Sequence, residues 1–298
     1  MVHTARKGGD EIEVIERTIQ IGCGSSISIY PLGDVHIGAI HCDEDAFEKQ
    51  VDVIRRTKNA YWVGMGDMAD CITDGDKRFD SCSIAPWVVK DDIIESQRKR
   101  LVGILAPIKE KCLCYLTGNH EESIRRYHRD DITKHIVDDL GVPYGSYAAF
   151  IQLHMTRPSS NERHMYTIHA WHGAGGAQTN GARVQRLMRL VMANEADIYF
   201  MGHLHSIESL PPAKLGVRNG RIKGVPMVAT TTGSWLKTYM QGAPISYGEC
   251  KGYMPSTVGC PIVTIHPTSN TISLHMSQQV SGCLSSVNVT ESSTEVKE

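Results

Sequence analysis

Five short blocks of the sequence carry side chains that bind metal ions. The blocks are DVH, GDMAD, GNHE, WH and GHLH, and a glycine lies in or beside each of them. Together they offer carboxylate, imidazole and amide ligands and no thiolate, a mixture that suits borderline divalent ions such as zinc, manganese, iron or nickel. The set is larger than one tetrahedral ion needs, and it is enough for two ions if one carboxylate bridges them. The side chains concerned are Asp34, His36, Asp67, Asp70, Asn119, His120, His172, His203 and His205.

Each block follows a segment with the apolar pattern of a buried strand. In an open α/β sheet, ligands bind at the carboxyl ends of the strands, so the five loops are expected to meet in one crevice. A single Asp-x-His or Gly-His-x-His would carry little weight in a chain with 14 histidines, whereas five blocks in this order favour a metal site. The strands that must position them are expected at 26–32, 61–65, 112–116, 165–169 and 197–201.

The segments between these strands have the apolar period of helices. We predict helices at 43–58, 90–108 and 182–193, so that strand, helix and strand alternate as in βαβ units. Such repetition indicates an α/β fold with a mainly parallel sheet covered by helices. At the N-terminus, residues 11–20 suit a strand or a helix, and the turn at 22–26 favours a β-hairpin arm leading into the first buried strand.

The sequence after about residue 206 consists of short β segments. A hairpin is expected from 261–266 and 271–276. No internal repeat and no Pro- or Gly-rich linker divides the chain, so we expect a single domain over residues 1–284. The final segment, 285–298, is rich in Ser, Thr, Glu and Val without periodicity, which predicts a disordered tail.

The composition argues against several classes of protein. The chain has 298 residues with 31 basic and 33 acidic side chains, so bulk charge does not hold it to nucleic acid or anionic lipid. No apolar run approaches the roughly 18 residues of a membrane span, and the polar N-terminus lacks the apolar core of a secretory signal. Nine scattered cysteines without paired CxxC units are typical of free thiols in a reducing compartment. We therefore expect a cytoplasmic protein with no membrane partner.

The five blocks, taken in order, resemble the calcineurin-like metallophosphoesterase family. Its pattern of DxH, GDxxD, GNH followed by Asp or Glu, a single His, and GHxH is matched by DVH, GDMAD, GNHE, His172 and GHLH. The resemblance covers roughly residues 28–206 and extends less clearly beyond them. It implies a four-layer sandwich in which two central mixed β-sheets are flanked by helices. It also implies two divalent ions at the sheet edge, and manganese is the metal that we favour for assays.

The resemblance further implies a role for each side chain. One ion would be bound by Asp34, His36 and His205 and the other by Asn119, His172 and His203, with Asp67 bridging the two. His120 would then be free to stabilise the phosphoryl group or to protonate the leaving oxygen. In the phosphatase branch of the family the second acid of GDxxD orients this histidine, which implicates Asp70. A loop cap that bonds backbone amides is the alternative for Asp70.

Two histidines compete for the fourth block. His169 and His172 are three residues apart, so on one continuous strand they face opposite sides and cannot both enter the site. We prefer His172, because it stands at the strand end before Gly173, where the chain must turn. His169 lies between Ile168 and Ala170 and is expected to be a satisfied core histidine.

The sequence favours a hydrolase that cleaves phosphoester bonds with metal-activated water. Asp70 is followed by Cys71 and Ile72, whereas the family's protein phosphatases typically have Arg-Gly there. We therefore expect a phosphodiesterase or nuclease acting on nucleic acid or nucleotides. Arg125 or Arg126, directly behind GNHEE, is a candidate clamp for a substrate phosphate, although most such arginines are simply solvated. The alternatives are a phosphomonoesterase and a non-catalytic scaffold with the same fold.

Overall fold

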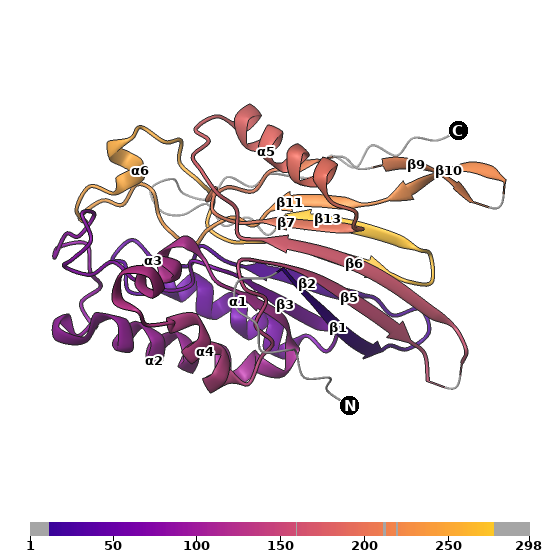
Figure 1. Cartoon of the computed structure of the whole chain (residues 1–298), viewed down its shortest axis with the longest axis horizontal. Coiled ribbons are helices and arrows are strands. Elements are labelled where there is room, and N and C mark those ends of the chain that lie inside the picture. Colours follow the sequence, from indigo (N-terminus) through magenta and orange to yellow (C-terminus); the bar gives the residue numbers. More distant parts are fainter. Residues whose placement is uncertain (1–11, 159, 211–212, 219, 277–298) are drawn as a thin grey trace.

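The chain folds into two β-sheets packed face to face between helices (Figure 1). The computed structural model describes residues 12–158, 160–210, 213–218 and 220–276. One sheet has the strand order β13-β12-β2-β3-β4 and the other has the order β1-β5-β6-β7-β11-β8. Both sheets contain parallel and antiparallel neighbours, so the expected α/β architecture with two central mixed sheets is confirmed.

The first sheet is covered on its outer face by four helices. Phe47 and Ile54 of the first helix and Trp62 of the sheet are fully buried in the core between them. The helix containing Phe47 begins where Asp43 accepts a hydrogen bond from the Ala46 amide, a typical N-cap. The strands are β2 (Ile27–Leu32), β3 (Ala60–Met65), β4 (Cys112–Leu116), β12 (Pro261–His266) and β13 (Thr271–Met276). The helices are α1 (Glu44–Arg56), α2 (Ile93–Leu105), α3 (Asn119–His128) and α4 (Ile132–Leu140).

The second sheet is covered by the long helix α5 (Asn180–Ala193), seen above it in Figure 1. Leu187 and Leu190 of α5 pack on Tyr199 and Met201 of the sheet. The strands are β1 (Glu13–Gln20), β5 (Ala148–Thr156), β6 (Arg163–Trp171), β7 (Ile198–Met201), β8 (Ser209–Leu210) and β11 (Val228–Thr231).

The faces that the two sheets turn towards each other form one continuous apolar core. Ile27 and Ile29 of β2 meet Ile151 and Leu153 of β5 there, and all four are nearly inaccessible to solvent. Residues two apart share one face of a strand, so alternate side chains of β2 and β5 fill this layer. The layers are therefore helices, sheet, sheet and helix, which is the expected four-layer sandwich.

Most of the expected elements are present, including the closing hairpin of β12 and β13, but three expectations are wrong. The sheet expected to be mainly parallel is instead two mixed sheets, in which β12 pairs antiparallel with β13 and β2, β5 with β6, and β8 with β11. The N-terminal strand β1 does not form a hairpin with β2; it pairs in parallel with β5 in the other sheet. The helix expected at 90–108 is interrupted, because 3-10 turns at Lys90–Asp92 and Ala106–Lys111 flank α2. Pro107 lies at the start of the second turn, where its missing N–H is tolerated.

The remaining elements lie outside the two sheets. The strands β9 (Ala213–Arg218) and β10 (Arg221–Pro226) form a separate antiparallel ribbon, and α6 (Tyr247–Cys250) is a single turn. No helix among the described residues is long and apolar enough to cross a membrane. The tail predicted at 285–298 lies outside the described residues.

Candidate metal centre

The five blocks meet at the carboxyl ends of the strands that precede them. β2, β3 and β4 run parallel in one sheet, and β6 and β7 run parallel in the other, so their ends point to the same edge. Three overlapping sets of side chains there each offer ligand atoms within 4.8 Å of one another. The sets are Asp34, His36 and His205; His36, Asp67 and His120; and Asp67, His172 and His203.

The backbone of these loops adopts a conformation that side chains rarely accept. A positive φ brings the Cβ close to the following carbonyl oxygen and costs about 1–2 kcal/mol for a residue other than glycine. Hydrogen bonds between the loops hold this strain; for example, the Asp34 amide donates to the Gly66 carbonyl at 3.0 Å. The candidate ligands with positive φ are Asp34 (49°), His36 (55°), Asp67 (49°), His203 (70°) and His205 (50°).

The glycines of the blocks allow the loops to approach one another. Gly66 has a φ of 84°, and a Cβ there would lie 2.6 Å from the Gly118 nitrogen and 2.7 Å from His172 Nδ1. A Cβ on Gly118 would lie 2.1 Å from Asp67 Oδ1. Larger residues at either position would push the candidate ligands apart, which explains why glycine accompanies these blocks.

One half of the centre combines a carboxylate with two imidazoles. His205 Nε2 lies 3.4 Å from Asp34 Oδ1 and 3.3 Å from His36 Nε2. Burial lowers the pKa of His36, so its ring is neutral and can offer a lone pair. Burial also lowers the pKa of His205, but the Asp34 carboxylate outweighs that effect and raises it. These are the three residues predicted to share one ion.

The other half is built around His172. Its Nδ1 donates to the Met65 carbonyl at 2.7 Å, and its Nε2 lies 3.1 Å from Asn119 Oδ1 and 3.4 Å from Asp67 Oδ2. Although burial disfavours its charge, the carboxylates of Asp67 and Asp34 raise the pKa of His172 to about 9. The same two carboxylates that favour the charged form of this ring would also favour a cation beside it.

His203 completes this second set with a nitrogen that lacks a partner. Its Nδ1 is buried and has no hydrogen-bond partner among the described residues. Burial lowers the pKa of His203 to about 4, so this ring is neutral at ordinary pH. Buried polar atoms are normally paired, and a neutral imidazole nitrogen left unpaired among carboxylates fits a cation site.

His169, the competing histidine of the fourth block, lies away from the centre. It is buried within β6, and its ring lies 4.5 Å from that of Phe150. The two histidines therefore occupy different surroundings, as their spacing predicted. The expectation of a satisfied core histidine is wrong in one respect, because His169 Nδ1 is buried without a hydrogen-bond partner among the described residues. Burial correspondingly lowers the pKa of His169 to about 4.

His120 is held by the loop that contains Asp70, although mainly through the backbone. Its Nδ1 donates to the Asp70 carbonyl oxygen at 2.5 Å, whereas the Asp70 carboxylate lies 3.8 Å away. That carboxylate lies closer to His36 Nδ1, at 3.3 Å. The predicted pairing of Asp70 with His120 is thus present as a contact, and Asp70 also touches a candidate ligand.

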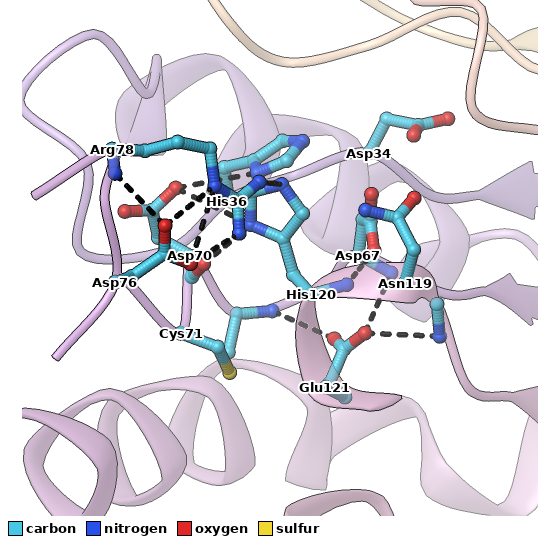
Figure 2. A network of polar contacts seen from close by, with 12 residues as sticks. Asp34, His36, Asp67, Asp70, Cys71, Asp76, Arg78, Asn119, His120 and Glu121 are labelled. Atoms are coloured by element: carbon cyan, nitrogen blue, oxygen red, sulfur yellow. Dashed lines mark hydrogen bonds and ion pairs between the residues drawn. The ribbon is translucent and has the colours of Figure 1, made fainter. Parts of the chain in front are cut away.

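Glu121 is a functional candidate that the motif reading left without a role. Its carboxylate is buried and accepts the amides of Asp67 (3.0 Å), Met68 (2.7 Å), Ala69 (3.1 Å) and Gly118 (2.9 Å), as Figure 2 shows in part. Burial and the Asp67 carboxylate raise the pKa of Glu121, and the hydrogen bond from the Ala69 amide opposes that effect. Glutamate at the third position of a helix is a capping signal, which could have indicated this role.

Arg78 is the second residue that the sequence did not reveal. Its Nη1 lies 3.0 Å from His120 Nε2, while Nε and Nη2 bind Asp76 at 3.0 and 2.7 Å (Figure 2). The paired guanidinium lowers the pKa of Asp76 to about 2. The loop between β3 and α2 thus places a guanidinium within hydrogen-bonding distance of His120 Nε2. Arg78 is brought to His120 by the tertiary folding of this loop, so no local sequence motif predicts its position.

The two arginines predicted to bind substrate lie on α3, beside the centre rather than in it. Arg125 and Arg126 bind the Glu122 carboxylate at 2.7 and 3.5 Å. Both line a pocket that also contains Asn119, the first residue of the same helix.

Comparisons with known proteins found only distant structural similarity. No protein-family model matches the chain, and no curated protein matches its sequence. A predicted phosphoesterase from Streptococcus pneumoniae, described as a conserved uncharacterized protein, is 14% identical with a TM-score of 0.32, over 81% of this chain and 83% of that one. A single mutant of Vps29 from Entamoeba histolytica is 12% identical with a TM-score of 0.26, over 84% and 97% of the two chains. Likeness at this level carries no argument about activity.

Proposed function

We propose that the chain is a phosphoester hydrolase of the calcineurin-like metallophosphoesterase type that uses two divalent ions. The observation that carries this proposal is the meeting of five separate loops around Asp67, which shares its site with both halves of the centre. Asp34, His36 and His205 would hold one ion, and Asn119, His172 and His203 the other, with Asp67 between them. When bound, two such ions supply activated water and positive charge beside the phosphoryl oxygens.

The donor set fits this assignment. His203 Nδ1 is buried and has no hydrogen-bond partner in the described part of the chain, and the Asp67 and Asp34 carboxylates raise the pKa of His172. Both features suit a site that binds cations. The His172 Nδ1–H donates to the Met65 carbonyl, which directs Nε2 to the site, as outer hydrogen bonds of metal-binding histidines do. Glu121 positions Asp67 in a similar way, because its carboxylate accepts the backbone amides of Asp67 and Met68.

His120 is the proposed catalytic residue among the chain's own groups. The Asp70 carbonyl accepts its Nδ1–H, so the ring is fixed with Nε2 directed towards Arg78. In this arrangement Nε2 accepts a hydrogen bond from the guanidinium and carries no proton. To protonate a leaving oxygen, Nε2 must first gain a proton and part from Arg78. Alternatively, His120 does not donate a proton and instead orients the phosphoryl group through Arg78. The two roles are distinguished by how strongly the activity of His120 variants depends on the leaving group.

We favour diester substrates, namely nucleic acid or nucleotides, because Cys71 and Ile72 replace the phosphatase continuation of GDxxD. The second candidate is a phosphomonoesterase, and Arg78 is the observation that favours it. A terminal phosphate carries a second negative charge, and a guanidinium beside His120 is suited to neutralise it. Arg78→Ala should then lower kcat/KM for monoesters more than for diesters. The difference between the two losses of transition-state stabilisation should be about 1–3 kcal/mol.

The test is an activity screen of manganese-reloaded protein. Bis-p-nitrophenyl phosphate, p-nitrophenyl phosphate, a cyclic nucleotide, and single-stranded and duplex DNA would be compared, with chelated protein as the blank. We expect metal-dependent hydrolysis with diesters preferred. Preference for the monoester, abolished by Arg78→Ala, would establish the second candidate. Tight metal binding with no hydrolysis of any substrate would instead indicate the non-catalytic scaffold.

A further inference from the structure

A pocket opens beside the metal centre between α3 and the segment 144–147. It has a volume of about 520 Å³, within the usual size of a small-molecule site. Asn119 belongs both to this pocket and to the candidate ligands, so the pocket adjoins the centre. We call it the tyrosine pocket, and its lining residues are Thr117, Asn119, Glu122, Ser123, Arg125, Arg126, Tyr127, Tyr144, Ser146 and Tyr147.

Three aromatic rings surround this pocket, and one of them joins it to the centre. The Tyr147 ring lies 5.3 Å from that of the candidate ligand His172 in an edge-to-face arrangement, with an interplanar angle of 80°. Its hydroxyl donates to the Gly173 carbonyl at 2.8 Å, so the ring is fixed at both ends. Tyr144 is half-buried on the same segment, and Tyr127 on α3 is 76% exposed. Aromatic side chains therefore line the pocket that lies next to the centre.

The charge of the pocket suits an uncharged aromatic group carried by a phosphate. Burial raises the pKa of Tyr144 to about 12, so its hydroxyl stays neutral. Arg125 and Arg126 both contact the Glu122 carboxylate, so two guanidinium groups lie along this wall. Guanidinium planes and tyrosine rings are the side chains on which nucleobases stack.

A second hollow of comparable volume, about 490 Å³, shows that size alone does not define the site. It lies between α1 and α2, is lined by residues such as Glu48, Arg55 and Arg100, and has neither an aromatic ring nor a candidate ligand in its lining. Only the tyrosine pocket, of these two, combines aromatic walls with a side chain of the metal centre.

We infer that the tyrosine pocket binds the nucleobase of a nucleotide or of a nucleic-acid strand whose phosphate lies at the metal centre. This inference rests on the proposed function and narrows it to substrates in which an aromatic base is joined through its sugar to the scissile phosphate. The base would stack on Tyr127 or Tyr144. Arg126 would contact the edge of the base or, in a strand, the neighbouring phosphate.

The experiment compares two diesters with the same leaving group, in manganese-loaded protein. The p-nitrophenyl ester of thymidine 5′-phosphate carries a base, and methyl p-nitrophenyl phosphate does not. We expect kcat/KM for the thymidine ester to be higher by about 5- to 100-fold, the range of one base–aromatic stack. Tyr127→Ala, Arg126→Ala and the pocket-filling Ser123→Trp should each reduce this ratio. The matched control is Arg56→Ala, because Arg56 also lies on a helix and binds an acid four residues earlier, Asp52, and it should keep the ratio.

A binding measurement, which does not depend on catalysis, separates this inference from the proposed function. Calorimetry should show tighter binding of thymidine 5′-monophosphate than of inorganic phosphate, and Ser123→Trp should remove the difference. If neither ester is hydrolysed, the proposed function fails, and the calorimetric difference still decides whether the pocket binds a base. Equal kcat/KM for the two esters, or a preference that survives all three pocket variants, would overturn the inference while leaving hydrolysis established. A strand substrate preferred over the mononucleotide ester would identify nucleic acid as the source of the base.

Discussion

The metal centre and the tyrosine pocket lie side by side, yet they are built in different ways. In the centre, Asp34, His36 and Asp67 are at most 2% exposed and sit on backbone in the left-handed region. In the pocket, Tyr127 is 76% exposed on the surface of α3 and its backbone is an ordinary helix. The centre is thus fixed by burial and by hydrogen bonds to backbone amides that hold its strained loops, whereas much of the pocket is fixed only by a helix surface.

Under the proposed function, this difference would separate two roles. Groups that must meet an ion or a reacting atom need positions fixed to a fraction of an ångström, which rigid strand ends and bonded loops provide. Groups that recognise the rest of a substrate can adapt, because stacking tolerates many geometries. Changes in the centre should therefore lower the turnover of every substrate, and changes in the pocket should alter the preference between substrates.

The largest effect is expected from Asp67→Asn. The amide has one acceptor oxygen and no charge, so both halves of the centre would lose their shared ligand. Hydrolysis of both the thymidine and the methyl ester should fall to the level of chelated protein. If any activity can still be measured, the ratio of kcat/KM for the two esters should be unchanged. Metal analysis after reloading would accompany the kinetics, and Asp138→Asn on the exposed face of α4 is the control. An Asp67→Asn protein with full metal content and activity would refute the bridging role.

The next largest effect is expected from His120→Asn. A positioned acid or base contributes roughly 10²- to 10⁴-fold, so turnover of both esters should fall by that factor while metal content and folding are retained. The loss should shrink for esters with better leaving groups if His120 protonates the leaving oxygen. His135→Asn, at an exposed site on α4, is the matched control. Loss of metal from the His120 variant would show that this histidine is a ligand.

Glu121→Gln tests whether the centre depends on the four backbone amides that donate to the Glu121 carboxylate. The glutamine has one acceptor oxygen, so about two of the four amides would lose their partner and the free energy of unfolding should fall by about 2–5 kcal/mol. Metal affinity should fall by roughly 10- to 100-fold, as for other outer groups of metal sites. Denaturant unfolding and metal titration would measure both, with the exposed Glu48→Gln as control. A variant as stable as the wild type would show that the amides find other partners.

A smaller effect is expected from pH, through His172. Its folded-state pKa of about 9 lies above the unfolded value, so the protonated ring stabilises the ion-free protein fully below about pH 6.5 and the contribution is lost as pH rises through about 9. The difference in Tm between chelated wild type and His172→Gln should therefore shrink from pH 6 to pH 10. Metal loading at pH 7 should release this proton, so affinity rises towards pH 9. A Tm difference that does not depend on pH would contradict the assigned protonation.

The sequence predicted the centre better than its surroundings, for physical reasons. Strands and the polar blocks after them are local patterns, and parallel strands bring their ends together in any such fold. The partner of β1 is not local, because pairing with β5 joins residues more than a hundred positions apart, whereas the hairpin reading used only the nearest turn. The interruption of the helix around Pro107 is likewise set by how the chain enters β4.

The residues that escaped prediction act through tertiary contacts. Arg78 reaches His120 from a loop with no motif, and Tyr144 and Tyr147 reach α3 from a segment between two elements. Glu121 was visible only as the last letter of GNHE, and its four amide contacts come from the loop after β3 as well as from its own helix. Arg125 and Arg126 were placed beside the centre by their sequence position alone, and a substrate role for them remains a prediction.

The most direct test of the account is the metal content of the active protein. Chelated protein would be reloaded with manganese, freed of excess ion, and analysed for metal and for hydrolysis of bis-p-nitrophenyl phosphate on the same sample. The account predicts about two ions per chain, with activity rising as the second ion binds. A protein that is fully active with one ion per chain, or that binds two and hydrolyses no phosphoester, would contradict it.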